Sequence, residues 1–288
     1  MKVFLTGGSG YIGRVTIQAL VRRGVQVAAL ARSEDSAGVV RALGAVPVQG
    51  DLTRTDVLRA AASDADGVIH MGQHYGPDTA EVDRAAAAAL QDGAGAGPYV
   101  HTGGVWVYGD TEGVVDEDAP LSPPGITAWR LENEKRVLAR AATGERPVVV
   151  MPGLVHGRSG GLVETFYAAP GRETGSVPCV GDGANHWSTV HVDDIAELYA
   201  LALNAAPGSV YAGVGELHPT QREIAHAVSG AIGRPGAVRH LTEAEAEEQM
   251  GPIAEAFALD QRLTGARARR ELGWRPTRLD LTADLARR

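Results

Sequence analysis

The amino-acid sequence predicts an α/β protein, with a doubly wound parallel sheet and a smaller α/β lobe at its C-terminal end. Short apolar runs alternate with amphipathic or alanine-rich stretches through the first half of the 288 residues, the pattern of repeated strand–helix–strand units. A glycine-rich turn directly after the first apolar run marks the start of the first unit. The sequence pattern of the second half is different, with shorter apolar runs and longer loops between the helical stretches.

The glycine-rich turn is Thr6-Gly7-Gly8-Ser9-Gly10-Tyr11-Ile12-Gly13, and apolar residues at helical spacing follow it. Gly7, Gly10 and Gly13 stand where such a turn needs a tight bend, close approach of the backbone to a pyrophosphate, and close packing of helix on strand. Unpaired N–H groups and the positive end of the helix dipole would hold a phosphate there. We therefore expect a Rossmann-type dinucleotide site that uses Gly7, Gly10, Tyr11, Ile12 and Gly13.

This turn sets the predicted domain organisation. Residues 1–155 form the dinucleotide-binding domain, residues 192–215 return to it, and residues 156–288 form mainly a substrate-binding lobe. In the first domain we expect strands at 25–30, 45–48, 67–71 and 99–102, with helices at 53–62, 79–92 and 126–140. In the second half we expect helix 162–169, two short strands at 176–180 and 188–190 around residues 181–187, a strand near 210–211, and helices at 192–204, 219–232 and 242–250.

The residues after the second strand indicate which dinucleotide binds. An NAD site needs a carboxylate there for the 2′-hydroxyl of the adenine ribose, whereas the 2′-phosphate of NADP needs a cation. Arg32 supplies that cation, with Ser33 beside it, so we expect NADP(H) rather than NAD. Glu34 and Asp35 come later and keep NAD as an alternative, and Arg32 is also consistent with a solvated loop.

The exits of the next strands add residues to the expected cofactor site. Gly50-Asp51-Leu52 follows the third strand and would place a carboxylate against the adenine amino group. Met71 ends the fourth strand, and Gly72 after it would bring backbone close to the cofactor. Ligands of open α/β sheets bind beyond the carboxyl ends of the strands, so residues 103–109 after the fifth strand should line a reaction pocket.

Composition excludes several partners. The chain has 27 Lys and Arg against 35 Asp and Glu, and the net charge of -8 argues against nucleic acid or an anionic membrane as partner. No apolar span is long enough for a membrane helix, and the first strand follows Met1 at once, so we expect a cytoplasmic protein without a signal peptide. The single cysteine, Cys179, excludes an internal disulfide and is expected to be a half-buried apolar residue.

Several motifs together carry a resemblance to a known family. They are the glycine turn, Gly50-Asp51-Leu52, the Val107-Tyr108-Gly109 that ends residues 105–109, Met151-Pro152-Gly153, and the segments 190–196 and 271–276. With these motifs the chain resembles the extended or atypical short-chain dehydrogenase/reductases, the superfamily of NAD-dependent sugar epimerases and dehydratases. The resemblance implies a nicotinamide dinucleotide that Pro152 helps to bind, and a C-terminal lobe that covers the nicotinamide and selects the substrate. It also suggests a homodimer through the helices after strands four and five, although residues 85–89 are equally consistent with an intramolecular packing face.

The resemblance does not extend to the catalytic residues of the family. That family uses a Ser or Thr and a Tyr-x-x-x-Lys pair, in which the tyrosine transfers the proton and the lysine lowers its pKa and holds the nicotinamide ribose. No tyrosine of this chain is followed by lysine at that spacing. One register places Arg130 and Glu134 at the two positions. A second register places Ile126 and Arg130 there. We prefer it, because it aligns Glu134 with the glutamate that usually follows the lysine by four and keeps the usual distance to Pro152. Counted back from Tyr108-Gly109, the Ser/Thr position falls on Gly104.

Other residues must then supply the chemistry. Our catalytic candidates are Thr102 and Tyr108 at the exit of the fifth strand, and Arg130, which would also contact the cofactor, as would Thr102. An arginine can hold ribose hydroxyls but stays protonated, so it cannot easily shuttle protons. Trp106 and Trp129 are expected to form apolar walls of the pocket.

Histidines are further candidates because they titrate near neutrality. Four of them fall in loops that this topology directs at the cleft: His74, His156, His186 and His191. His191 precedes two aspartates and an apolar-periodic run, so a helix N-cap explains it better than catalysis. The His, Asp and Glu residues show no compact metal-ligand spacing, and we expect no metal site.

The sequence therefore predicts an NADP(H)-binding, oxidoreductase-like enzyme that acts on a small organic metabolite such as a carbonyl, enone or imine. Two alternatives stay open: a redox-neutral isomerase, cyclase or dehydratase on the same fold, and a non-enzymatic NADP-dependent sensor. The absence of the family's Ser or Thr and its Tyr-x-x-x-Lys pair, which transfer the proton, favours both alternatives. Sugar-nucleotide epimerisation is disfavoured, because transient oxidation of a hydroxyl needs the missing base.

Overall fold

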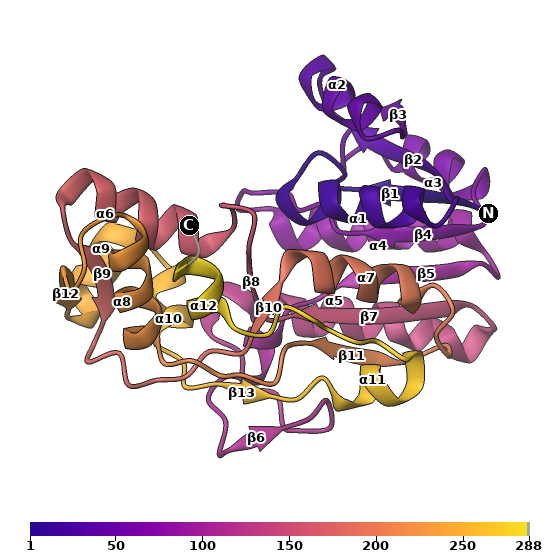
Figure 1. The fold of residues 1–288 in the computed structure, drawn as a ribbon. Coiled ribbons are helices and arrows are strands. Elements are labelled where there is room, and N and C mark those ends of the chain that lie inside the picture. Colours follow the sequence, from indigo (N-terminus) through magenta and orange to yellow (C-terminus); the bar gives the residue numbers. More distant parts are fainter. Residues whose placement is uncertain (287–288) are drawn as a thin grey trace.

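Seven parallel strands form one central sheet in the order β11-β7-β5-β4-β1-β2-β3 (Figure 1). The structure, a computed structural model, describes residues 1–286. From β1 the chain adds strands outward on one side, then crosses back to add β4, β5, β7 and β11 on the other side, which confirms the doubly wound fold. The strands are β1 (Lys2–Thr6), β2 (Gln26–Ala31), β3 (Val46–Gln49), β4 (Gly67–His70), β5 (Pro98–Thr102), β7 (Arg146–Pro152) and β11 (Val210–Gly213).

Helices cover both faces of this sheet because successive strand residues point to opposite faces. In β1, Val3 and Leu5 join the core under α1 (Tyr11–Arg22) and α7 (Val192–Ala202), whereas Phe4 joins the core on the other face. That second face is covered by α3 (Thr55–Ser63), α4 (Thr79–Ala94) and α5 (Trp129–Ala139). At the β3 edge lies α2 (Glu34–Ala42), and α11 (Ala266–Leu272) packs near α7 (Figure 1).

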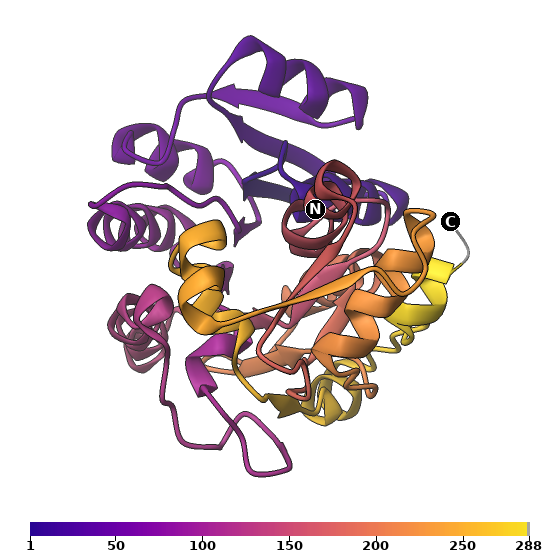
Figure 2. The same cartoon turned by 90° about the vertical axis from the view of Figure 1, so that its left-hand side faces the viewer.

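The C-terminal lobe lies beside the carboxyl ends of the sheet strands, and Figure 2 views the molecule from that side. Its own core contains an aromatic cluster in which Tyr167 and Trp187 pack on Phe257. The elements of the lobe are α6 (Ala169–Thr174), β9 (Val177–Val180), α8 (Gln221–Ala231), β12 (Val238–Leu241), α9 (Glu243–Met250), α10 (Ile253–Phe257) and α12 (Leu281–Ala286). Two further pairs of short parallel strands are β8 (Leu154–His156) with β10 (Thr189–His191), and β6 (Val114–Val115) with β13 (Arg262–Leu263).

The expected short strands on either side of residues 181–187 are present as β9, which pairs with β12, and β10, which pairs with β8. Asn185 ties the loop between them to the carbonyl oxygens of Phe257 and Leu259. Two other expectations need correction. Helix 162–169 continues through a π-helical turn, Glu164–Ala168, into α6 and stops where Gly175 takes a φ of 83°. Helix 126–140 is broken at its start by a 3-10 turn, Gly125–Thr127, before α5.

Residues 192–215 contribute α7 and β11 to the sheet layer, although the domain division at residue 155 stays a prediction. Ala86, Ala87 and Ala89 of α4 are buried within the chain, so intramolecular packing accounts for most of that alanine run, and the homodimer stays a prediction.

In residues 1–286 no helix combines the length and the apolar character needed to cross a membrane. Cys179 is fully buried rather than half-buried, and its thiol donates to Gln221 Oε1.

Candidate active site

A cavity of about 1170 Å³ opens at the carboxyl ends of the strands. It is larger than the roughly 300–1,000 Å³ of most ligand pockets, so it has room for a dinucleotide together with a substrate. The cavity lies where the strand order reverses, between β1 and β4, which is the position expected for a ligand of a doubly wound sheet. Thirteen of the residues predicted for the site line it: Gly7, Gly10, Tyr11, Ile12, Gly13, Arg32, Asp51, Leu52, Met71, Gly72, Thr102, Arg130 and Pro152.

The glycine turn has the close geometry that a pyrophosphate site requires. Gly7 has a φ of 74°, and a Cβ on it would stand 2.7 Å from the carbonyl oxygen of Met71. A Cβ on Gly13 would collide with the Gly7 carbonyl group, whereas a Cβ on Gly10 would meet only that oxygen, at 3.1 Å. The first turn of α1 carries no acidic side chain. No carboxylate of this turn therefore competes with an anion for its N–H groups and for the positive end of the helix dipole.

Thr6 holds the exits of β1 and β4 together behind this turn. Its Oγ1 accepts the backbone N–H groups of Met71 at 3.2 Å and Gly72 at 3.0 Å, and lies 2.6 Å from Nδ1 of His70. Because the oxygen already accepts two hydrogen bonds, its own proton points to His70 Nδ1. The threonine thus fixes both backbone segments that the cofactor must approach, a role that the sequence did not reveal.

A buried polar network continues from His70 under the site. His70 Nε2 lies 3.5 Å from Oδ1 of Asp83, and Asn133 donates to Oδ2 of Asp83 at 2.9 Å. Burial alone would raise the pKa of Asp83, but hydrogen bonds from His70 and Asn133 outweigh it and hold that pKa well below its usual range. Burial also lowers the pKa of His101, on the neighbouring strand, to about 3. A neutral histidine and an ionised aspartate thus join β4, β5, α4 and α5 beneath the cavity.

The exit of β2 carries the predicted 2′-phosphate cation. Arg32 is exposed and lines the cavity, and its carbonyl oxygen accepts from Gln49 Nε2 at 3.3 Å. Glu34 is turned away, because its carboxylate pairs with Arg41 at 2.6 Å. Ser33 does not line the cavity: its hydroxyl caps α2 and accepts the N–H of Ser36 at 3.2 Å, and its expected contact with the cofactor stays a prediction.

Asp51 supplies the one carboxylate among the residues that line the cavity within the described chain. Its Oδ1 accepts the hydroxyl of Thr53 at 2.6 Å and the backbone N–H of Thr53 at 2.8 Å. These hydrogen bonds lower the pKa of Asp51, so the group is ionised at neutral pH. The carboxylate is therefore held in place as an acceptor for an amino or hydroxyl group of a ligand.

The two positions of the preferred register, Ile126 and Arg130, both line the cavity. Arg130 Nη1 donates to the carbonyl oxygen of Thr102 at 3.1 Å, and its guanidinium lies 4.6 Å from the ring centroid of Trp129. Glu134, which the other register places at the lysine position, does not line the cavity. It is 4% exposed, and a Cβ on Gly103 would lie 2.7 Å from its Oε1. The preferred register therefore agrees with the positions of all three residues.

Tyr108 was expected to contribute to catalysis, and the structure contradicts this. The side chain is 2% exposed, packs in the core under α4 and α5, and donates to the carbonyl oxygen of Glu117 at 3.2 Å. The ring turns inward because residues 105–108 form a 3-10 turn whose side chains Val105, Val107 and Tyr108 are buried. Only Trp106 of this turn is half-buried, and it lines the cavity as expected.

The end of the cavity next to the lobe is apolar. We call this the apolar end and define it by Trp106, Ile126, Trp129, Leu162 and Ile253, all of which line the cavity. The 3-10 turn that carries Ile126 is held against α10, since Gly125 N–H donates to a carboxylate oxygen of Glu255 at 3.0 Å. The ring of Trp106 contacts Phe257 of α10 at 6.0 Å between centroids. The walls of the apolar end thus come from both the sheet domain and the lobe.

Of the four histidines predicted in loops at the cleft, one lines the cavity and three do not. Only His74 lines the cavity, with its Nε2 2.9 Å from Oδ1 of Asp78. His186 instead contacts Asp260, with its Nδ1 2.9 Å from Oδ1 of that residue. His191 caps α7, as predicted, and its Nδ1 accepts the backbone N–H of Asp193 at 3.1 Å. His156 lies buried beside it on β8.

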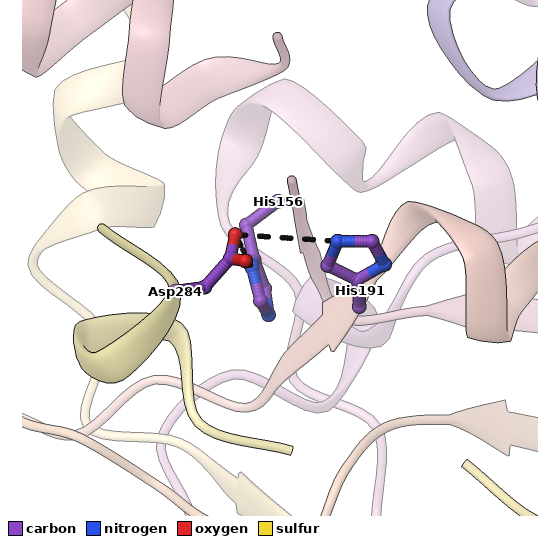
Figure 3. A group of neighbouring side chains, drawn as sticks. All are labelled: His156, His191 and Asp284. Atoms are coloured by element: carbon purple, nitrogen blue, oxygen red, sulfur yellow. Dashed lines mark ion pairs between the residues drawn. The ribbon is translucent and has the colours of Figure 1, made fainter. Parts of the chain in front are cut away.

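Figure 3 shows a cluster that the sequence spacing concealed, formed by His156, His191 and Asp284. One ligand atom of each residue lies within 4.8 Å of the others, and Asp284 Oδ2 is 3.9 Å from His156 Nδ1 and 4.0 Å from His191 Nε2. Burial lowers the pKa of His191, so its ring is neutral. Because Nδ1 accepts the cap hydrogen bond, the ring proton lies on Nε2, and that atom has no lone pair for a metal. The cluster is explained by docking of α12 on β8 and β10.

Comparisons with known proteins agree with this fold. Residues 3–212 match the NAD dependent epimerase/dehydratase family, and the chain belongs to that family. An uncharacterized protein of Saccharomyces cerevisiae is 29% identical over 301 residues, which cover 99% of this chain and 98% of the yeast protein. A 4-hydroxy-2-methyl-3-oxo-4-farnesyl-3,4-dihydroquinoline-1-oxide ketoreductase of Stigmatella aurantiaca is 31% identical over 223 residues, 72% of this chain and 66% of that enzyme.

A solved structure shows the same architecture. The crystal structure of a dTDP-glucose 4,6-dehydratase double mutant from Streptomyces venezuelae, with NAD bound, superposes with a TM-score of 0.83 at 24% identity. The match covers 100% of this chain and 95% of the dehydratase. At that identity the likeness shows the fold alone. Further relatives carry the names of reductases, dehydrogenases, epimerases and dehydratases, so family membership leaves the reaction open.

Proposed function

We propose that this protein is an NADP(H)-dependent reductase of apolar carbonyl compounds. The observation that carries the proposal is the apolar end of the cavity, whose five defining side chains bear no charge. Within the described residues that line the cavity, formal charges belong to Arg32, Asp51 and Arg130. Arg130 lies at the border of the apolar end, because its guanidinium is 4.6 Å from the ring centroid of Trp129, whereas Arg32 and Asp51 follow β2 and β3. A ligand there is recognised by burial of apolar surface, worth about 25 cal/mol per Å².

The other end of the cavity fits a nicotinamide dinucleotide. At Gly7 and Gly13 neighbouring backbone atoms fill the space that a Cβ would need, so the turn packs closely, and the first turn of α1 has no acidic group. Arg32 stands at the ribose position with Glu34 turned to Arg41, which supports NADP(H) over NAD. When bound, this cofactor would supply the hydride that reduces a carbonyl carbon.

Sugar-nucleotide chemistry is less well supported. A sugar nucleotide carries a diphosphate that needs its own cations or N–H donors in the substrate region. The apolar end offers two indole N–H groups and aliphatic side chains, with Arg130 against Trp129 as the cation at its border. The relative from Stigmatella aurantiaca is named as the ketoreductase of a farnesyl-substituted quinoline oxide, which is also a large apolar compound. Reduction of an apolar ketone is therefore the reaction that both the walls and this relative favour.

The test is to follow NADPH absorbance with a panel of ketones, acetophenone and an alkyl 3-oxoester among them, beside UDP-glucose. We expect NADPH to be consumed with the apolar ketones and not with the sugar nucleotide. Trp106→Ala should raise KM for acetophenone and leave NADPH affinity unchanged, because the indole lies at the apolar end. If none of the ketones led to NADPH consumption, or if only the sugar nucleotide were converted, the proposal would be rejected in favour of a redox-neutral enzyme or a sensor.

A further inference from the structure

The missing family tyrosine has a counterpart elsewhere in the chain. Tyr199 of α7 is fully buried, and its hydroxyl donates to Oγ1 of Thr102 at 2.9 Å. Thr102 is the last residue of β5 and lines the cavity. The contact joins residues 97 positions apart, so no sequence spacing indicates it. A tyrosine hydroxyl thus reaches the catalytic edge of the sheet from the face opposite to α5.

This contact decides where the Thr102 proton points. A tyrosine hydroxyl has one proton, and here it is given to Thr102 Oγ1. Burial raises the pKa of Tyr199, which keeps that hydroxyl protonated and acting as donor. Within residues 1–286 the hydrogen bonds of the structure give the Thr102 hydroxyl proton no protein acceptor. The proton is therefore available to an acceptor in the cavity.

Arg130 fixes the same residue from a third direction. Its Nη1 donates to the backbone carbonyl of Thr102 at 3.1 Å, and its Nη2 lies 3.4 Å from Oε1 of Gln73. A threonine hydroxyl, a tyrosine hydroxyl and a cation therefore meet at the end of β5, from β5, α7 and α5. These are the chemical groups of the family's catalytic set, supplied from different chain positions except for the cation.

We propose that the Thr102 hydroxyl binds the carbonyl oxygen of the substrate and that Tyr199 is the positioning residue that orients this hydroxyl. The inference rests on the proposed reductase function. As the hydride adds to the carbonyl carbon, the π electron pair of the C=O bond moves to oxygen, and the Thr102 O–H stabilises the negative charge. Thr102 keeps its proton, and the proton that completes the alcohol comes from water in the open cavity.

The pair of hydroxyls acts better than Thr102 alone for two reasons. A hydrogen bond that Thr102 accepts from Tyr199 polarises the one it donates, so that the second bond is strengthened. The Tyr199 bond also occupies one acceptor position of the threonine oxygen, which limits the directions in which its own proton can point. Preorganised donors of this kind are worth about 100- to 1,000-fold in kcat when one is removed.

The experiment uses NADP⁺-loaded protein and acetophenone labelled with ¹³C at its carbonyl, so that binding is observed without reduction. A hydrogen bond to the oxygen moves the labelled carbonyl resonance downfield. We expect that shift in the wild type and in Thr102→Ser, its loss in Thr102→Val, and a smaller shift in Tyr199→Phe. With NADPH, kcat should fall about 100-fold in Thr102→Val and about tenfold in Tyr199→Phe, while the NADPH dissociation constant of Tyr199→Phe stays unchanged.

Tyr211→Phe is the matched control, because Tyr211 is also buried and donates to Glu271 away from the cavity. It should leave both the resonance and kcat as in the wild type. If Tyr199→Phe lowered the folding stability as Tyr211→Phe does and left the carbonyl resonance unchanged, Tyr199 would be a merely structural tyrosine and the inference would be overturned. An unshifted resonance in a wild-type protein that reduces acetophenone would overturn it as well. Failure of the wild type to bind or reduce any apolar ketone would overturn the proposed function instead, and this inference with it.

Discussion

The two ends of the cavity differ in how they keep the features of the family. The glycine turn keeps all three glycines, and the structure gives each a steric or positional reason to be small. Away from the glycine turn, Gly104, Ile126 and Arg130 occupy the positions of the serine, tyrosine and lysine in the preferred register, and two of these three can exchange no proton. The chain thus keeps the glycines of the family's dinucleotide turn and lacks the residues of the family's proton transfer.

The difference has a physical origin. A pyrophosphate is recognised by backbone N–H groups, which need a specific chain path and therefore specific glycines. A carbonyl oxygen needs only a donor at the right distance, and hydroxyls on several elements can reach it. The first end is therefore fixed by local sequence, whereas the second can be rebuilt from distant residues such as Thr102 and Tyr199.

The largest expected effect is at the glycine turn. Gly10→Val should weaken NADPH binding more than about 100-fold, which is about 2.7 kcal/mol, the scale of one or two hydrogen bonds to a charged group. The folded state should survive, because a Cβ at Gly10 meets only the Gly7 carbonyl oxygen, at 3.1 Å. Calorimetric titration with circular dichroism measures both. Gly38→Val in α2 is the control, since its added side chain meets open space, and unchanged binding in Gly10→Val would place the phosphates elsewhere.

Arg32 tests the same end with a smaller effect. Arg32→Ala should weaken NADPH by about 10- to 100-fold, since a hydrogen bond to a charged group contributes about 1.5–3 kcal/mol. NADH lacks the 2′-phosphate, so its affinity should barely change. Arg136→Ala, on the exposed face of α5 and paired with Glu132, is the matched arginine control. Equal losses for NADPH and NADH in calorimetric titrations would contradict the assignment of Arg32 to the 2′-phosphate.

Arg130 lies between the two ends, and its removal should cost about tenfold in NADPH affinity, the scale of one charge-assisted hydrogen bond. Arg130→Lys keeps the charge but loses the planar fork, so it should recover only part of what Arg130→Ala loses. Fluorescence titration of NADPH measures both variants. Full recovery in the lysine variant would show that charge alone matters there. No loss in either variant would return Arg130 to the status of an arginine that only supports the Thr102 carbonyl.

The smallest expected effect concerns Glu134, under Gly103. Burial raises the pKa of Glu134 to about 7, from an ordinary value of 4.5. The folded state therefore favours the protonated carboxyl, and its stability should fall as pH rises through 7, by about 1 kcal/mol between pH 6 and 8. Glu134→Gln should remove that part of the pH dependence of the unfolding free energy. A variant whose profile matches the wild type would show that Glu134 is ionised throughout.

Local sequence was enough for the elements whose determinants are local. The alternation of apolar runs predicted the sheet, the glycine spacing predicted the tight turn between β1 and α1, and His191 before two aspartates predicted the cap of α7. Arg32 at the exit of β2 was also placed correctly in the cavity. In each case the residues that determine the feature lie within one turn or one strand of it.

Features that depend on distant contacts could not be predicted in this way. Tyr108 was expected in the pocket because it follows β5 closely along the chain. Its ring instead packs in the core under α4, and its hydroxyl donates to the carbonyl oxygen of Glu117. The partner of β9 is β12, some 60 residues later, and the partner of Thr102 is Tyr199. Neither periodicity nor spacing specifies which of many distant segments will meet.

The most direct test of hydride transfer to an apolar carbonyl is an isotope experiment. NADPH carrying deuterium at the transferable position of its nicotinamide is incubated with the wild-type protein and acetophenone, and the product alcohol is analysed by mass spectrometry. We predict one deuterium on the carbinol carbon of 1-phenylethanol and none when NADPH is unlabelled. Recovery of unchanged acetophenone, or of alcohol without deuterium, in a preparation that binds NADPH would contradict the account.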